Sequence, residues 1–202
     1  MSEDYQLVES DEVFRGHVIA LHKDTLRMGD QTTVREIVEH PGAVGVVAID
    51  DDDNVVLVNQ YRHPVRRRLD ELPAGLLDVE GEPALTGAQR ELVEEASLRA
   101  SQWDVLVDLY TSPGFSNEAI RIYLARGLSP VDDRDGFVPE HEEVHMTVTR
   151  VPLADAVRRA LAGEIQNAAA VAGILAAGLA HARGWTGLRP ADAPWPAKPD
   201  RA

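Results

Sequence analysis

Short β-branched runs, separated by turns and interrupted by single helical segments, are the feature that most limits the folds open to this chain. The runs "AVGVVAID" and "VVLVNQYR" flank the polar turn "DDDN" and predict a β-hairpin. The stretch "QWDVLVDLYTSPGFSNEAIRIYLARGL" predicts a strand, a loop and a second strand. Strands outnumber helices, without steady alternation of the two. The order of the segments therefore favours an α+β fold, with a mixed sheet sandwiched between helices, over a doubly wound parallel sheet.

The pattern divides the chain into three parts. Residues 1–42 contain β-like segments such as "HVIALHKDTLRM" and "TTVREIVEH", which predict a small antiparallel sheet. Such a sheet is marginal alone, so we expect it to pack on its own domain or on another subunit. Residues 43–183 hold the remaining strands, a helix that begins at Pro83, and one or two alanine-rich helices with a break at Gly163. Residues 184–202 are rich in proline and alanine, which predicts a flexible tail.

Composition excludes several classes of protein. The 202 residues carry a formal net charge of −14 and no cysteine, so disulfides, thiolate zinc sites and cysteine nucleophiles are excluded. An acidic surface repels nucleic-acid phosphates, and we expect no nucleic-acid partner. No run of about 18 apolar residues and no basic-then-apolar leader is present, which predicts no membrane partner and a cytoplasmic protein. The basic segment "YRHPVRRRL" suits one small phosphorylated ligand, with a solvated turn as the alternative.

The stretch "RELVEEASL" places three glutamates within five residues. Glu91 and Glu95 lie one helical turn apart beside an apolar stripe, and Glu94 lies further round toward solvent. Like charges at this spacing destabilise a helix by about 0.2–0.5 kcal/mol, and the helix dipole disfavours negative charge late in a helix. A divalent cation would reverse both effects, because carboxylates on successive turns converge on one hard ion. The pattern indicates a Mg²⁺ site and metal-assisted phosphoryl chemistry, with a solvated acidic face as the alternative.

The loop before this helix supports the interpretation as a metal site. The segment "GLLDVEGEPALTGAQRELVEEASL" resembles the signature of the Nudix hydrolases, in which a glycine and a glutamate precede seven residues and then Arg-Glu-apolar-x-Glu-Glu-x-Gly-apolar. Gly75 opens the match, Glu82 is the first glutamate and Arg90 begins the helical part. Two positions depart from the pattern: the spacing from Gly75 to Glu82 is one residue longer, and Ser97 stands where glycine is usual. Serine is less favourable at a helix C-cap, but neither departure removes a carboxylate.

The resemblance implies a fold and a metal site. The Nudix fold is an α/β/α sandwich around a mixed sheet, which agrees with the order of the segments. Glu91 and Glu95 would bind Mg²⁺ or Mn²⁺ together with the backbone carbonyl of Ala74. Glu94 would assist, directly or through water.

The same resemblance assigns roles around the metal. Arg90 would hold the glutamates by charge-assisted hydrogen bonds, and Gly75 and Glu82 would be structural, with Glu82 steadying the loop against the helix. A base for the attacking water is expected on "EHEEVHM", because ADP-ribose pyrophosphatases of this family carry a glutamate on the corresponding loop. Glu143 is the preferred base and Glu142 the second, with an ordinary acidic loop as the alternative.

Segments outside the signature resemble the ADP-ribose pyrophosphatases of the family. The stretch "SPGFSNE" resembles a loop typical of them, and "NQYRHPVRRRLDELPAG" resembles the strand and loop that enter the signature. Arg62 suits bidentate binding of pyrophosphate, with a surface salt bridge as the alternative. Glu71 is expected to accept from a ribose or adenine group or to cap its loop. Phe115 is expected to line the ligand pocket or to be a packed side chain, and Glu118 to touch ribose or water on the metal.

These resemblances imply a metal-dependent enzyme that hydrolyses ADP-ribose to AMP and ribose 5-phosphate. They also imply a homodimer, with the N-terminal strands exchanged or packed across the two-fold axis. Two alternatives stay open: a pyrophosphatase for another nucleotide sugar such as GDP-mannose, and a Nudix module that senses a ligand without catalysis. Such modules usually carry a DNA-binding winged helix, for which this chain has neither room nor basic surface.

Overall fold

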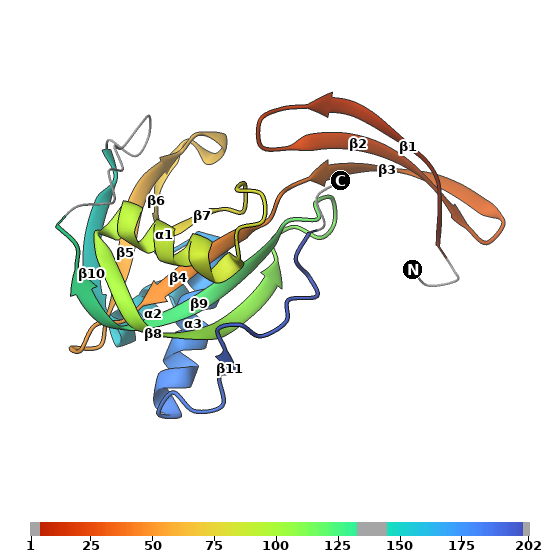
Figure 1. The fold of residues 1–202 in the computed structure, drawn as a ribbon. Coiled ribbons are helices and arrows are strands. Elements are labelled where there is room, and N and C mark those ends of the chain that lie inside the picture. The colour runs from red at the N-terminus through yellow and green to blue at the C-terminus, as the bar shows by residue number, and fades with distance from the viewer. Residues whose placement is uncertain (1–4, 133–144, 200–202) are drawn as a thin grey trace.

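The computed structural model describes residues 5–132 and 145–199, and it shows an α/β body from which a small sheet projects (Figure 1). The three antiparallel strands of the projecting sheet are β1 (Gln6–Arg15), β2 (Ala20–Met28) and β3 (Gln31–Glu39). This confirms the predicted N-terminal antiparallel sheet. Every residue of β1 is exposed, so the described chain leaves one edge of this sheet uncovered.

The body contains two further sheets. In the larger one the order is β11-β8-β9-β4-β7, and the sheet is mixed because β4 and β9 are parallel while the other pairs are antiparallel. Its strands are β4 (Ala43–Ala48), β7 (Ala74–Leu76), β8 (Leu98–Tyr110), β9 (Ala119–Pro130) and β11 (Arg189–Pro190). The smaller sheet is antiparallel, with β5 (Asn54–Arg62) between β10 (Thr147–Pro152) and β6 (Arg67–Glu71). A short 3₁₀ helix, η1 (His63–Val65), joins β5 to β6.

Helices cover both faces of the larger sheet, which completes the predicted α/β/α sandwich (Figure 1). The helices are α1 (Ala84–Ala96), α2 (Leu153–Leu161) and α3 (Ala168–Ala182). On β4, Val46 belongs to the same core cluster as Leu92 of α1. Its neighbour Val47 belongs to the other cluster with Ile174 of α3. Successive strand residues point to opposite faces, so a strand covered on both faces is apolar along its whole length.

The alanine-rich region forms two helices with the break where it was predicted. Gly163 lies between α2 and α3 with φ of +73°, a conformation that glycine adopts without steric cost. In the described part of the chain, no helix is both long and apolar enough to cross a membrane.

The predicted hairpin between β4 and β5 is wrong. The chain does reverse at "DDDN", where the Asp50 carboxylate accepts from the backbone N–H groups of Asp52 and Asn54 at 3.0 and 2.9 Å. The two strands then separate into different sheets, and in the described chain the two runs are joined by the isolated bridge Ile49–Val55, just beyond the end of β4. The β-branched runs predicted the strands and the turn correctly. They carry no information on pairing: β4 pairs with β7 and β9, and β5 pairs with β6 and β10.

The C-terminal segment is more ordered than its composition predicts. We expected a flexible tail from residue 184, yet β11 pairs with β8 and the chain is described as far as residue 199. The guanidinium of Arg121 on β9 is buried and donates to the carbonyls of Ala193 and Pro194 at 2.6 and 3.0 Å. The Trp195 ring lies 5.0 Å from the same guanidinium. A buried cation needs acceptors. Asp108 on β8 supplies two of them, and the tail supplies the other two without any periodic pattern in its sequence.

Helix α1 ends at the residue where the signature departs from its usual glycine. Ser97 is the C-cap, and its φ of 55° and ψ of 41° place it in the left-handed region. A residue with a Cβ is disfavoured in that region by about 1–2 kcal/mol relative to glycine. The predicted C-cap is therefore confirmed, and the serine is a local weakness of the fold.

We predict that Ser97→Gly stabilises the protein by about 0.5–1 kcal/mol, after allowance for the greater freedom of glycine in the unfolded chain. The melting temperature should rise by about 1–4 °C in a calorimetric scan. Ala96→Gly is the matched control, because Ala96 is still helical and its replacement should destabilise by about 1 kcal/mol. A lower melting temperature for Ser97→Gly would contradict the prediction.

Candidate active site

Helix α1 and strand β7 bring the predicted metal ligands together. Glu91 and Glu95 are 8% and 6% exposed although both are acidic. Glu95 Oε2 accepts from the backbone N–H of Ala74 on β7 at 2.9 Å. A Cβ added to Gly75 would lie 2.0 Å from Glu91 Oε1, so the Glu91 carboxylate occupies the space that the missing side chain leaves. The glycine of the signature is thus what allows the helix to present a carboxylate directly over β7.

One arginine contacts three of the signature glutamates. Arg90 Nη1 donates to Glu91 Oε1 at 2.7 Å and to Glu94 Oε2 at 2.9 Å. Arg90 Nε lies 3.5 Å from Glu82 Oε1 on the preceding loop. The structure therefore gives Arg90 the contacts that a positioning role requires. Glu82 packs against the start of α1, since a Cβ added to Gly87 would lie 2.9 Å from Glu82 Oε2.

The charge at Glu91 is only partly compensated. Burial raises the pKa of the Glu91 carboxyl to about 7, and the negative charges of Glu94 and Asp78 add to this, while Arg90 opposes it. Asp78 was not singled out from the sequence, although it stands in the acidic spacer "LLDVEG" between Gly75 and Glu82, the first glutamate of the signature. A buried carboxylate with a raised pKa and acidic neighbours is an environment that a cation would stabilise.

The residues present fit a hard divalent cation. Glu91, Glu95 and the carbonyl of Ala74 supply only oxygen donors, which Mg²⁺ and Mn²⁺ prefer. Among the residues that the structure describes, no three His, Cys, Asp or Glu side chains converge in the way they do around a metal ion. A Mg²⁺ ion commonly keeps several waters and binds substrate phosphates as well as one or two carboxylates. Two carboxylates and one carbonyl therefore suit an ion that also contacts its substrate.

The raised pKa of Glu91 predicts that the metal-free protein loses stability as pH rises. Between its ordinary pKa of 4.5 and about 7, the native Glu91 carboxyl holds a proton that the unfolded chain has released. Stability is then fully present below pH 4.5 and falls through pH 7, by about 3 kcal/mol at most. Urea unfolding with a chelator at pH 5 and pH 7.5 measures this loss, and Mg²⁺ should restore stability at the higher pH. Glu91→Gln should flatten the pH dependence, and an unchanged dependence in that variant would contradict the assignment.

Arg62 and Glu71, both predicted to contact substrate, form one ion pair. Arg62 Nη2 lies 2.7 Å from Glu71 Oε2, and its Nε lies 3.0 Å from Glu71 Oε1. The Glu71 side chain is 4% exposed, whereas that of Arg62 is 45% exposed. The surface salt bridge left open by the sequence is therefore present, with a buried acid. The exposed guanidinium stays accessible to a ligand.

The loop "SPGFSNE" attaches to the end of β3. The carbonyl of Phe115 accepts from the backbone N–H of Val38 at 2.7 Å, and the Phe115 side chain is 55% exposed. Glu118 accepts from the Thr111 hydroxyl and lies 3.6 Å from His40 Nε2. Burial lowers the pKa of His40, and the charge of Glu118 opposes this. Sequence reasoning missed His40, because a lone histidine before a proline carries no pattern.

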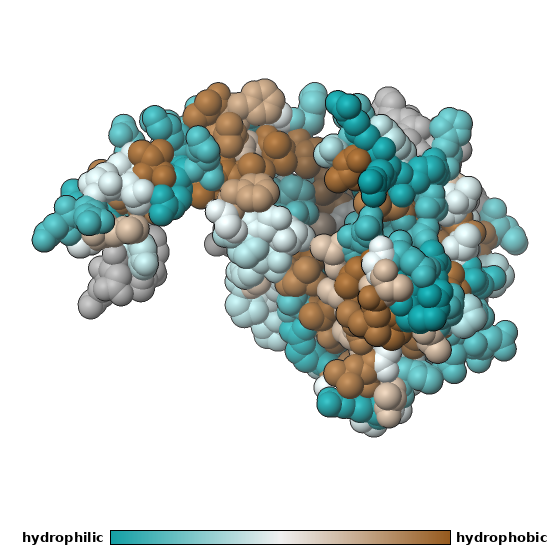
Figure 2. All heavy atoms as spheres, turned by 180° about the vertical axis from the view of Figure 1, so that it is seen from behind, coloured by the Kyte–Doolittle hydropathy of each residue, from teal (hydrophilic) through white to brown (hydrophobic). Residues whose placement is uncertain are grey.

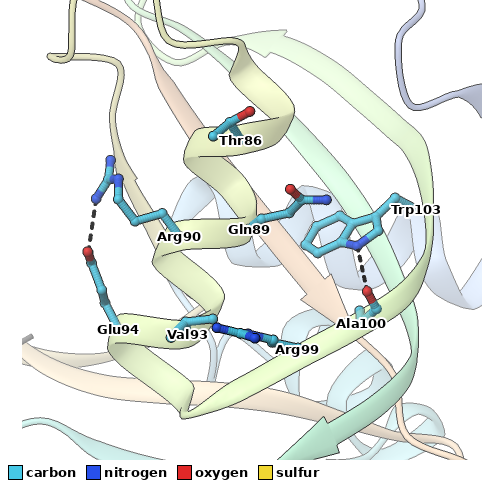
Figure 3. Close-up of a pocket in the computed structure, with 8 residues that line it drawn as sticks. All are labelled: Thr86, Gln89, Arg90, Val93, Glu94, Arg99, Ala100 and Trp103. Carbon is cyan, nitrogen blue, oxygen red and sulfur yellow. Dashed lines mark hydrogen bonds and ion pairs between the residues drawn. The ribbon is translucent and has the colours of Figure 1, made fainter. Parts of the chain in front are cut away.

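Several cavities adjoin the signature helix and loop, including one of 310 Å³ lined by Val79, Glu80 and Glu82, and two of them contain charged residues that contact or influence Glu91. One, of 590 Å³, is lined by residues of α1 and β8: Thr86, Gln89, Arg90, Val93, Glu94, Arg99, Ala100 and Trp103 (Figure 3). In this view Gln89 points toward the Trp103 ring, and the cavity shares Arg90 and Glu94 with the signature but neither buried glutamate. The other cavity, of 270 Å³, adjoins the signature loop at Leu76 and Asp78 and is bounded by Arg15, Glu39 and His40. Neither cavity is lined by Glu91 itself, but each is lined by a residue that acts on its charge, Arg90 in the first and Asp78 in the second.

The two glutamates expected to act as base lie outside the described residues. Glu143 and Glu142 belong to the segment between β9 and β10. Their role stays a prediction from the sequence.

A glycine-bearing strand beneath two buried glutamates of one helix, on an α/β/α sandwich, places the chain in a known family. The profile of the NUDIX domain matches residues 39–171, and the chain belongs to this family. It is 49% identical over 199 residues to the ADP-ribose pyrophosphatase of Mycobacterium tuberculosis (strain ATCC 25618 / H37Rv), which covers 97% of this chain and 93% of the relative. It is 34% identical over 168 residues to the ADP-ribose pyrophosphatase of Bacillus subtilis (strain 168), covering 83% and 89%.

A solved structure supports the fold. A crystal structure described as an ADP compounds hydrolase matches with a TM-score of 0.75 and 23% identity, covering 90% of this chain and 97% of that one.

Proposed function

We propose that the protein hydrolyses the pyrophosphate bond of ADP-ribose to give AMP and ribose 5-phosphate. The observation that carries the proposal is the 49% identity, over 97% of this chain, to an enzyme named ADP-ribose pyrophosphatase. The site supports it, because the two buried glutamates and the arginine of the signature are in contact with β7 or with one another. Both expected departures from the signature, the longer loop and Ser97, leave these contacts intact.

The signature residues would bind the cation and hold its carboxylate ligands in position. A Mg²⁺ ion, or Mn²⁺ in its place, held by Glu91, Glu95 and the Ala74 carbonyl would neutralise pyrophosphate charge and make water more acidic. Arg90 keeps the carboxylates of Glu91 and Glu94 in position.

Other residues would hold the substrate and move the proton. Arg62, oriented by Glu71, would bind the pyrophosphate, since a guanidinium matches phosphate oxygens in pairs. Phe115 and Glu118 would contact the nucleoside or ribose from the loop beside β3. Glu143, or Glu142 in second place, would accept the proton of the attacking water.

We also propose a homodimer with the N-terminal sheet in its interface. Large apolar side chains on this sheet are exposed, among them Leu7, Val8, Val13, Phe14 and Val34. Figure 2 shows hydrophobic side chains gathered over the projecting sheet. Contiguous exposed apolar surface of this kind is typical of an interface. Light scattering should give twice the chain mass of 22.1 kDa, and a monomer mass would contradict the dimer.

A substrate panel tests the proposed activity. The purified protein is incubated with ADP-ribose, GDP-mannose and other nucleotide sugars, with and without Mg²⁺ or Mn²⁺, and the products are separated by chromatography. AMP and ribose 5-phosphate should form fastest from ADP-ribose, and only with a divalent cation. Faster hydrolysis of GDP-mannose or another nucleotide sugar would overturn the choice of substrate. The cytoplasmic location stays a prediction from the sequence.

A further inference from the structure

The β5–β6 hairpin concentrates positive charge on an acidic protein. Against a net charge of −14 for the chain, the segment from Tyr61 to Glu71 contains four arginines and two carboxylates. In Figure 1 this hairpin projects at the top of the body, on the same side as β7. The basic segment singled out from the sequence is thus a discrete protrusion near the signature.

Within the part of the chain that the structure describes, contacts account for two of these four arginines. Arg62 is paired with Glu71 at 2.7 Å. Arg68 donates to Asn59 Oδ1 at 2.7 Å and to the carbonyl of His145 at 2.6 Å. The second carboxylate of the hairpin, that of Asp70, is bound by Asn59 and Arg159. Both acids of the hairpin are therefore already engaged, and neither neutralises the two arginines at the tip.

The two arginines at the tip, Arg66 and Arg67, are exposed. Among the residues that the structure describes, neither guanidinium makes an ion pair or a hydrogen bond. Arg66 also has a left-handed backbone, with φ of 54° and ψ of 39°, at the C-cap of η1. Glycine fits that conformation best, so a cation is retained at a position where the backbone disfavours any side chain. Strain of this kind at an exposed turn is a reason to look for a role of the side chain outside the fold.

The tip lies within electrostatic range of the predicted substrate contacts. Arg67 begins β6 and is the cross-strand partner of Arg62 on β5. Glu71, which binds the Arg62 guanidinium, ends β6, a span of about 13 Å from Arg67 at about 3.3 Å per residue. Ala74 follows three residues after Glu71. At low ionic strength, charges act over about 30 Å, whereas at physiological ionic strength the range is about 8 Å.

We propose that Arg66 and Arg67 attract nucleoside diphosphate esters, which carry two negative charges, to the Arg62–Glu71 end of the site. The inference rests on the proposed function for the identity of the substrate. The two arginines act on capture and not on the chemical step, because in the described part of the chain neither guanidinium contacts a signature glutamate. They offset the repulsion that an acidic protein otherwise exerts on an anionic substrate.

The experiment measures steady-state hydrolysis of ADP-ribose by the double variant Arg66→Gln/Arg67→Gln at several salt concentrations. Two positive charges about 13 Å from a dinegative group predict a KM about 3–5-fold higher at about 10 mM salt, with kcat unchanged. At about 0.5 M salt the variant and the wild type should differ by less than about 1.5-fold, because screening removes the effect. The double variant Arg66→Lys/Arg67→Lys keeps both charges and should keep the wild-type KM.

Two controls separate charge at the tip from other effects. Arg183→Gln removes one exposed arginine at the C-cap of α3, on the other face of the sheet, and should leave KM unchanged at every salt concentration. Arg66→Gly removes one charge and relieves the backbone. It should not lower the melting temperature, yet it should raise KM at low salt. An unaltered KM at low salt in this equally stable variant would show that the charge of Arg66 has no role in capture.

The outcomes are distinguishable from those of the substrate panel. Hydrolysis of a different nucleotide sugar in place of ADP-ribose would overturn the proposed substrate alone, and KM is then compared on that compound. Wild-type turnover with an unchanged KM and unchanged salt dependence in Arg66→Gln/Arg67→Gln would overturn the role of the two arginines alone.

Discussion

Glu95→Gln should lower kcat for ADP-ribose by about 10²–10⁴-fold while the protein stays folded. The Glu95 carboxylate accepts from the Ala74 N–H at 2.9 Å, and the carbonyl oxygen of a glutamine can accept the same bond. The substitution therefore keeps the local hydrogen bond and removes one negative charge from the buried pair. Losing that charge weakens cation binding where the proposed mechanism needs it. Product formation at saturating ADP-ribose, followed over a range of Mg²⁺ concentrations, measures the effect.

Glu80→Gln is the matched control for this variant. Glu80 lies on the signature loop but is exposed, and its replacement should leave kcat within about twofold of wild type. The comparison also bears on the alternative of a non-catalytic sensor. A sensor would bind its ligand and keep its response in Glu95→Gln, without turnover. Hydrolysis at the wild-type rate in Glu95→Gln would overturn the assignment of Glu95 as a metal ligand.

Gly75→Ala should lower activity by about 10²-fold through the position of Glu91. The new Cβ would lie 2.0 Å from Glu91 Oε1 and 2.1 Å from its Cδ, so the carboxylate has to leave its place over β7. The end of a flexible side chain moves at modest cost in stability. Displacing a ligand by about 1 Å from the Ala74 carbonyl, in contrast, disrupts the geometry on which the chemistry depends. The concentration of Mg²⁺ at half-maximal activity should rise along with the loss of kcat.

Gly45→Ala tests whether the effect is specific to Gly75. Gly45 pairs with Ala74 in the same ladder, one residue away from the Val44–Gly75 pair. A Cβ at Gly45 would meet Ile120, Ile122 and Leu72 at 3.6–3.8 Å, which is ordinary contact. Activity should stay close to wild type in this variant. Equal losses in the two variants would show that the strand tolerates no added side chain and that the Glu91 explanation is wrong.

The chemistry of the site was largely readable from one stretch of sequence. In "RELVEEASL" the spacing of Glu91 and Glu95 predicted two carboxylates on one side of a helix, and the structure buries both. The glycine at position 75 was predicted only as part of a signature. Position 75 must lack a side chain because the Glu91 carboxylate takes that space, and this depends on how β7 lies against α1.

The sequence did not predict strand pairing or packing between segments that are far apart in the chain. The β-branched runs predicted β4 and β5 but not that β4 would pair with β9, which lies more than seventy residues later. The C-terminal segment was predicted to be flexible from its proline and alanine content. Its attachment depends on Arg121, a buried cation that pairs with Asp108 and also donates to the carbonyls of Ala193 and Pro194.

The sequence by itself determined the longer helices and strands, the class of fold and the acidic donor set, because periodicity, turn residues and the spacing of like charges act over a few residues. The short strands β7 and β11 had no such pattern. Only the tertiary structure decided which strands pair, that Arg62 is held by Glu71, and that Glu118 lies beside His40. The local sequence around each of these residues does not predict which residue it contacts. The burial that raises the pKa of Glu91 likewise arises from the whole sandwich, because desolvation depends on every element packed around the carboxyl.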